Sequence, residues 1–124
     1  MSLGKQEGQG TFSKSMSELR WTKAEKIVAK RVFEKCYQRE CEAVLAKLKE
    51  RVATADKPSD IWLIHDFLTE ELKKIEDKYD YRYSILIFVF ARLLKEGWLQ
   101  ESDLDGIEED KIERIKYLAT YNQK

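Results

Sequence analysis

Apolar and small residues recur at steps of three and four through the first half of the chain, which is the period of one face of an α-helix. These residues are Val28, Val32, Phe33, Cys36, Tyr37, Cys41, Val44, Leu45, Leu48 and Val52. Thr22 followed by Glu25 makes a capping-box sequence just before the pattern. We therefore predict a helix from about Lys23 to about Thr54. At about 1.5 Å per residue it spans roughly 45–50 Å, which exceeds the diameter of a globule of this size, so a partner chain along it is expected.

A break follows this helix, because Pro58 cannot continue a helix, and Ser59 or Asp60 is a suitable N-cap for the next one. The second predicted helix has one apolar and one charged face. The apolar face holds Ile61, Ile64, His65, Leu68, Leu72, Ile75 and Tyr79. The charged face holds Glu70, Glu71, Lys73, Lys74 and Glu76. This helix ends in the linker "DKYDYRY", residues 77–83, in which Asp80 is the expected N-cap of a third helix.

The segment 84–90 is rich in β-branched and aromatic residues, a composition that also suits a strand. The apolar run continues, however, to Leu94 and stops at Gly97, a residue that commonly follows the end of a helix. We therefore predict a third helix that is apolar on all sides and buried. Turn residues follow from 98 to 106, and a last helix is expected over roughly 108–121.

The predicted fold class is all-α, with one long N-terminal helix followed by three shorter helices. This class agrees with the scarcity of helix breakers, since the 124 residues include one proline and five glycines. Residues 1–20 are rich in Gly, Ser, Gln and Lys and lack a sustained period, so we expect a disordered tail there. Residues 21–124 are expected to form a single helical domain.

The charges are balanced, with 23 basic and 23 acidic side chains. This balance argues against a nucleic-acid-binding protein, which needs a basic excess to displace counterions. Residues 1–58 carry a net charge of +5 and the remainder −5, a separation that suits the association of like chains. The apolar run 85–94 is too short to cross a bilayer and contains Arg92. With no secretory signal at the start, we expect a cytoplasmic protein without membrane insertion.

The sequence offers one candidate for acid/base catalysis, the pair formed by the only histidine, His65, and Asp66. Consecutive helical residues point about 100° apart, so Asp66 is not placed to orient His65, and no activated nucleophile lies nearby. One histidine with scattered carboxylates does not define a metal site, and a Gly-rich phosphate loop is lacking. Cys36 and Cys41 have the spacing of neither a helical disulfide nor a zinc site. The sequence therefore disfavours an enzyme and predicts no cofactor.

Trp62, His65 and Asp66 stand at positions i, i+3 and i+4 of the second predicted helix, so they form one patch. A tryptophan beside polar side chains is typical of a protein–protein interface. The alternative is that Trp62 belongs to the core while Asp66 is simply solvated. The spacing alone does not choose between these interpretations.

Two longer stretches carry a family resemblance. "DIWLIHDFL" and "IEDKYDYRYSILIFVFARLLKEGWL" resemble the fluorescence recovery protein family of cyanobacteria, and "FEKCYQRECEAVLAKL" resembles the family's first long helix. The resemblance implies an all-helical homodimer without catalytic activity. It also implies binding to the photoactivated orange carotenoid protein. The regulator would speed the return of that protein to its resting form and its release from the phycobilisome, which restores antenna fluorescence.

Residue by residue, the family's functional tryptophan, histidine and aspartate match Trp62, His65 and Asp66, and the phenylalanine of "IFVF" matches Phe88. One departure stands one turn further on. After "HDFL" the cyanobacterial members usually read Ser–Ala–Lys–Arg, whereas residues 69–72 here read Thr–Glu–Glu–Leu. Because the local charge changes sign, the resemblance implies either the orange carotenoid protein as the partner or a divergent homologue that serves another, unknown protein.

Overall fold

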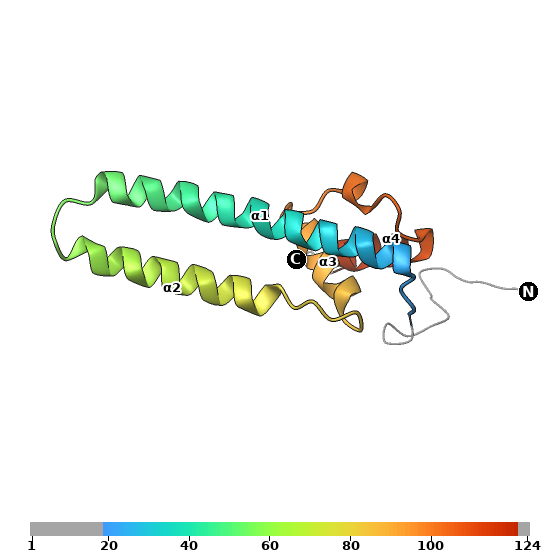
Figure 1. Cartoon of the computed structure of the whole chain (residues 1–124). Helices are drawn as coiled ribbons and strands as arrows, with labels where there is room; N and C mark the ends of the chain where they lie inside the picture. Colours follow the sequence, from blue (N-terminus) through green and yellow to red (C-terminus); the bar gives the residue numbers. More distant parts are fainter. Residues whose placement is uncertain (1–18, 122–124) are drawn as a thin grey trace, which may run out of the picture.

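The structure, a computed structural model, describes residues 19–121 and is helical throughout its regular elements (Figure 1). Its elements are α1 (Lys23–Thr54), α2 (Asp60–Lys78), α3 (Leu86–Glu96), the short 3-10 helix η2 (Glu101–Leu104) and α4 (Glu109–Tyr121). This order confirms the predicted fold class of one long helix followed by three shorter α-helices. Residues 1–18 of the predicted tail lie outside the described residues, whereas Leu19 packs against the core.

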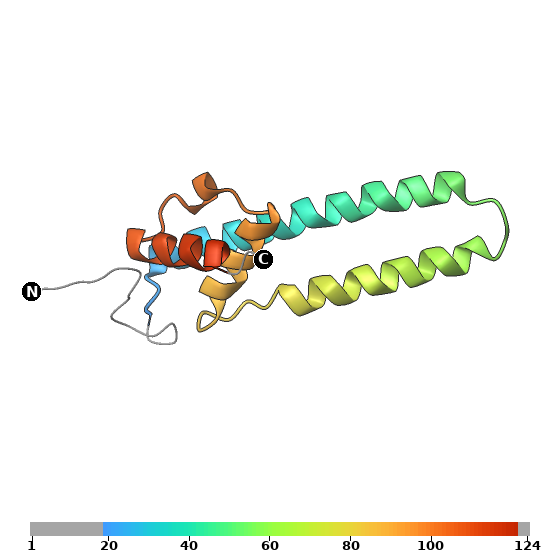
Figure 2. The same ribbon diagram turned by 180° about the vertical axis from the view of Figure 1, so that it is seen from behind.

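The molecule has two parts, which we call the hairpin and the head. α2 folds back along the C-terminal half of α1, which we call its far half, and these two segments form the hairpin (Figures 1 and 2). The head consists of the N-terminal half of α1 with α3, η2 and α4 packed against it. The linker of residues 79–85 joins the two parts, so α1 is the element common to both.

The predicted capping box at the start of α1 is present and also connects α1 to α4. The Thr22 hydroxyl accepts a bond from the Glu25 N–H at 3.1 Å, and the Glu25 carboxylate accepts one from the Thr22 N–H at 3.0 Å. The same carboxylate accepts bonds from the Glu108 N–H at 2.8 Å and the Lys111 ammonium at 3.1 Å. Burial raises the pKa of Glu25, but the three hydrogen bonds that its carboxylate accepts, together with the charge of Lys111, outweigh it, so its pKa lies below the usual value. Glu25 thus both caps α1 and holds the start of α4 against it.

The apolar core lies almost wholly in the head. Its fully or nearly enclosed side chains are Trp21, Ala29, Val32, Cys36, Leu86, Ile87, Val89, Phe90, Ala91, Leu93, Leu99, Leu104, Ile107, Ile115 and Ala119. α3 supplies the largest share, as its apolar sequence predicts. The expectation that α3 is buried on every side is wrong, because α1 and α4 cover only part of its circumference. Phe88 is 46% exposed and Arg92 faces solvent on the open side.

The predicted dry face of α2 is also only partly correct. Of its members, Ile75 is buried and Ile64 partly so, whereas Ile61, Leu68 and Leu72 are exposed. The face towards α1 is rotated relative to the predicted one and includes Phe67, Glu71 and Lys78 as partly or fully buried side chains. The physical reason is that two helices lying side by side each cover only one narrow strip of the other. At the end of the hairpin away from the head, no third described element covers the remaining sides.

Ser59 occupies the predicted N-cap position of α2 without capping it through its side chain, and the predicted cap of the third helix is wrong. The Ser59 side chain makes no capping bond, and the Asp60 carboxylate instead accepts the N–H groups of Asp56 and Lys57, at 2.8 and 3.0 Å, which closes the turn. Asp80 lies in the linker, where it pairs with Arg82, and α3 begins only at residue 86. Polar residues near a helix start have several competing backbone partners, so their presence does not settle which one they cap.

Two glycines adopt the left-handed conformation. Gly97, the predicted residue after α3, has a φ of 91°, and an added methyl group there meets open space. Gly106 has a φ of 101°, and an added methyl group would lie 2.9 Å from Cγ2 of Val28.

These two positions make a matched pair for mutagenesis. Gly97→Ala is expected to lower the free energy of unfolding by about 1–2 kcal/mol, which is the cost of the left-handed conformation for a residue with a Cβ. Gly106→Ala carries the same cost plus about 1–3 kcal/mol for crowding Val28. Urea denaturation of both variants measures the difference, and equal losses would contradict the close packing of the loop on α1.

Candidate partner-binding surface

The structure places Trp62, His65 and Asp66 together at the start of α2, with all three side chains in solvent. Trp62 is 64% exposed, so it does not belong to the core of the single chain. His65 Nδ1 lies 3.7 Å from Asp66 Oδ1, which is longer than a hydrogen bond, and both side chains are well exposed. His65 and Asp66 therefore do not form a fixed, desolvated acid/base pair. With Trp62 they form a patch that is accessible to solvent.

Further apolar side chains extend this patch along the hairpin. The exposed members, which we call the hairpin apolar surface, are Leu45 and Val52 of α1 with Ile61, Leu68 and Leu72 of α2, and Trp62 lies at its edge. Single exposed apolar residues are normal on any protein, but a group of this size on two adjacent helices is typical of an interaction site. The Arg51 guanidinium lies 4.1 Å from the Phe67 ring centroid and helps to close the end of the hairpin.

Phe88 lies on a different part of the molecule from the other three candidate residues. It stands in the first turn of α3, in the head, whereas Trp62 stands at the start of α2, at the opposite end of the hairpin (Figure 1). Its neighbour one turn further along α3 is Arg92, whose Nε donates to the Glu96 carboxylate at 3.0 Å. The structure therefore does not join the four predicted residues into one site but separates them into two.

The altered run of residues 69–72 lies beside the hairpin apolar surface. Thr69 turns its hydroxyl back to the His65 carbonyl at 2.9 Å. Glu71 is largely covered and its carboxylate lies 3.5 Å from the Lys74 ammonium, while Leu72 is 54% exposed. Leu72 thus enlarges the apolar surface, and the charge of Glu71 is directed towards a lysine of its own helix.

An ion cluster that the sequence pattern did not predict joins the hairpin to the head. Lys78, at the end of α2, is 5% exposed and donates to Glu40 of α1 at 2.6 Å and to Glu96 of α3 at 2.5 Å. The Tyr79 hydroxyl donates to the other Glu40 oxygen at 2.8 Å, and the Trp98 indole N–H donates to Glu96 at 3.2 Å. We call these five residues the junction cluster. The only sequence signal for it was Lys78 itself, three residues after the buried Ile75 on the same face of α2.

The surroundings of Glu96 in the junction cluster favour its ionised form. Burial raises the pKa of Glu96, but hydrogen bonds from Lys78 and Arg92 outweigh it and hold that pKa below its usual value. Burial and the hydrogen bond to Glu40 raise the pKa of the Tyr79 hydroxyl, so it remains a donor. The cluster therefore fixes the orientation of the head, with Phe88, relative to the hairpin, with Trp62.

Reactive groups and metal ligands do not gather within residues 19–121. Cys36 and Cys41 are unpaired, and burial raises the pKa of the Cys36 thiol to about 12, which keeps it protonated. In this part of the chain no group of three or more His, Cys, Asp and Glu side chains is placed to hold a metal ion. Among the same residues, no helix combines the length and the apolar character that crossing a bilayer requires.

Fold and surface together define the class: an all-α protein with a helical hairpin, a small head and a large exposed apolar surface. The family model described as photoprotection regulator fluorescence recovery protein matches residues 21–119, and the chain belongs to this family. The fluorescence recovery protein of Synechocystis sp. (strain ATCC 27184 / PCC 6803 / Kazusa) is 42% identical over 103 residues, which cover 83% of this chain and 94% of that protein. The resemblance found in the sequence is thereby confirmed.

Solved structures agree with this assignment. The fluorescence recovery protein of Synechocystis sp. PCC 6803 superposes with a TM-score of 0.76 at 42% identity, covering 82% of this chain and 99% of that one. The protein of Fremyella diplosiphon has a TM-score of 0.75 at 39% identity, with the same two coverages. The arrangement of hairpin and head is therefore shared with two members of the family.

Proposed function

We propose that the protein is a dimeric, non-catalytic regulator that acts in the cytoplasm by binding another protein and shifting its conformational state. Our first candidate partner is the photoactivated orange carotenoid protein, whose relaxation it would accelerate, thereby ending energy quenching at the phycobilisome. Membership of the photoprotection regulator family supports this proposal. The single observation that carries it is the exposed Trp62 beside the hairpin apolar surface, because an exposed tryptophan is costly in a free monomer and is typical of an interface anchor.

The hairpin apolar surface itself supports dimerisation and leaves Trp62 at its edge for the partner. The far half of the hairpin buries little on its own, and a second copy lying along it would cover Leu45, Val52, Ile61, Leu68 and Leu72. Identical copies paired about a twofold axis cover the same residues on both chains, which is the usual arrangement of a homodimer. The length of α1, 32 residues, provides a long contact line for such a pair.

The proposed mechanism requires no covalent step. A regulator that binds the resting arrangement of its partner more tightly than the active one shifts the population towards rest. It also accelerates the change if it binds the transition state more tightly than the active form. In this proposal Trp62 is the anchor, His65 and Asp66 form its polar rim, and Phe88 makes a second contact from the head. Neither a cofactor nor a metal takes part.

The alternative is an adaptor for an unknown protein outside the carotenoid photoprotection system. The observation that favours it is the run at residues 69–72, where a carboxylate, Glu71, and an exposed aliphatic side chain, Leu72, adjoin the hairpin apolar surface. An acidic partner surface would be attracted less strongly to this site than to a basic one.

Dark recovery of photoconverted orange carotenoid protein tests the proposal. We expect the wild-type chain at micromolar excess to accelerate recovery, and Trp62→Ala to weaken this effect about tenfold or more, since a buried aromatic anchor typically contributes 2 kcal/mol or more to binding. Tyr121→Ala, which removes an aromatic side chain of similar exposure from α4, should leave the acceleration unchanged.

Light scattering on the same samples provides the control for assembly, because the dimer has about twice the 14.7 kDa chain mass. A wild-type dimer that does not accelerate recovery would remove the orange carotenoid protein as the partner and leave the adaptor function. A protein that stays monomeric over a wide concentration range would contradict the dimer itself.

A further inference from the structure

A continuous row of aromatic rings connects the residue Trp21, just before α1, with α1 and the linker. Its members, in order of contact, are Trp21, Tyr83, Tyr81, Phe33, Tyr79 and Tyr37. Neighbouring ring centroids lie 4.8–6.0 Å apart, and most pairs meet edge to face. Such pairs hold one another in place, so the row is a rigid support.

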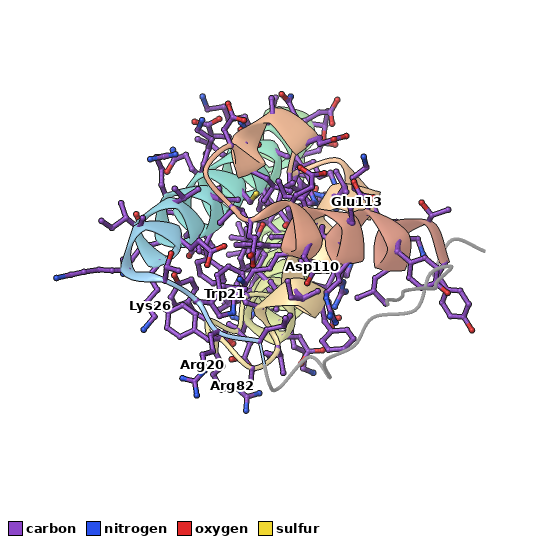
Figure 3. All side chains as sticks on the ribbon, turned by 90° about the vertical axis from the view of Figure 1, so that its right-hand side faces the viewer. Arg20, Trp21, Lys26, Arg82, Asp110 and Glu113 are labelled. Carbon is purple, nitrogen blue, oxygen red and sulfur yellow. The ribbon has the colours of Figure 1, made fainter. Side chains whose placement is uncertain are left out.

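Basic side chains lie over and around the outer end of this row. The Lys26 ammonium lies 5.0 Å from the Tyr83 ring centroid, and the Lys30 ammonium lies 5.9 Å from that of Tyr81. Figure 3 views the molecule from this end, with Arg20 and Arg82 projecting to the same side and Lys26 beside them. We call Arg20, Lys26, Lys30 and Arg82, with the rings of Tyr81 and Tyr83, the cation–ring face.

The carboxylates near this face do not balance its charge. Lys30 pairs with Glu34 at 3.6 Å, and the Arg82 guanidinium pairs with Asp80 through bonds of 2.9 and 2.6 Å. Among the ion pairs of residues 19–121, none involves Arg20 or Lys26. The face therefore keeps an excess of positive charge in the described structure.

The position of this excess on α1 is unfavourable for the isolated chain. Lys26 is the fourth residue of α1, at the end of its first turn, so it lies near the positive end of the helix dipole, where a cation is unfavourable. The acidic residue of the first turn, Glu25, lines a pocket together with Arg20, but its buried carboxylate pairs with Lys111. A negatively charged partner would relieve this repulsion, so the arrangement favours binding over the stability of the free chain.

We propose that the cation–ring face binds an acidic segment of a protein partner. Its cations are already ordered, Lys26 and Lys30 by the rings beneath them and Arg82 by Asp80, which lowers the entropy lost when carboxylates bind. The exposed part of Tyr83 offers an apolar contact between the cations. A protein segment fits better than a nucleic acid because the chain as a whole has no net charge. This site lies outside the hairpin apolar surface and does not depend on the proposed function.

The test measures binding of a fluorescein-labelled peptide of glutamate residues to the full chain by fluorescence anisotropy at low salt. Its glutamine counterpart and a short single-stranded RNA serve as comparison ligands. The double variant Lys26→Gln/Arg82→Gln is expected to bind the glutamate peptide about tenfold more weakly. Lys47→Gln/Lys49→Gln removes the same charge from the far half of α1 and should change binding by less than about twofold. All the altered side chains are exposed, so thermal unfolding of both variants should match the wild type.

The proposal is supported if the glutamate peptide binds, its glutamine counterpart does not, and only the face variant loses affinity. No binding of the glutamate peptide to the wild type would overturn it. So would equal losses in the two double variants, or tighter binding of the RNA than of the peptide. Acceleration of carotenoid-protein recovery is not part of this readout, so failure of the two proposals can be told apart.

Discussion

Lys78→Met should lower the free energy of unfolding by about 3–5 kcal/mol, which is the usual cost of removing one partner from a buried ion pair. The substitution removes the charge that compensates Glu40, whose side chain is 11% exposed, and leaves that carboxylate with the Tyr79 hydroxyl alone. It also removes one of the bonds that hold Glu96 of α3 against the end of α2. Urea denaturation followed by circular dichroism measures the loss.

The matched control is Lys74→Met, the same substitution one turn earlier on α2. The Lys74 side chain is 66% exposed and its ammonium lies 3.5 Å from Glu71, so we expect a change of less than about 1 kcal/mol. The double variant Lys78→Met/Glu40→Leu should recover much of the lost stability, because an apolar pair of similar volume replaces both charges. Similar losses for Lys78→Met and Lys74→Met would show that the junction cluster does not hold the head to the hairpin.

Phe90→Ala is expected to destabilise the protein by about 3–5 kcal/mol, the cost of a large cavity at a fully enclosed aromatic position. Phe90 is 0% exposed and belongs to the core formed by α1, α3 and α4. Phe88→Ala, two residues earlier on the same helix, removes a side chain that mostly contacts solvent and should cost less than about 1 kcal/mol. Thermal or urea unfolding of the two variants gives the comparison.

The same pair separates stability from function. If Phe88 is a partner contact as we propose, Phe88→Ala should reduce the acceleration of carotenoid-protein recovery while its unfolding curve stays close to that of the wild type. Phe90→Ala should reduce the acceleration only in proportion to the fraction of unfolded protein. If folded Phe88→Ala accelerates recovery as fully as the wild type, Phe88 is not a partner contact, and the proposed contacts are those of the hairpin alone.

Features that depend only on residues close together in the sequence were predicted correctly. The capping box at Thr22, the break at Pro58 and the glycine after α3 each act through neighbouring backbone groups, so a few residues of sequence define them. The grouping of Trp62, His65 and Asp66 on one side of α2 follows from the helix period in the same way. Asp80 was wrongly assigned as a cap because its carboxylate pairs with Arg82, and Ser59 stands at the N-cap position of α2 without a side-chain capping bond.

The sequence by itself determined the all-α class, the long first helix, the family and the candidate residues, because helix period, capping and motif are properties of neighbouring residues. Only the tertiary structure decided which apolar residues are covered, since the period marks an apolar strip without saying what lies against it. It placed Leu72 and Trp62 in solvent and Phe90 in the core. It also brought Lys78 between Glu40 and Glu96, residues 38 and 18 positions away, because burying a charge requires partners that only the folded chain supplies.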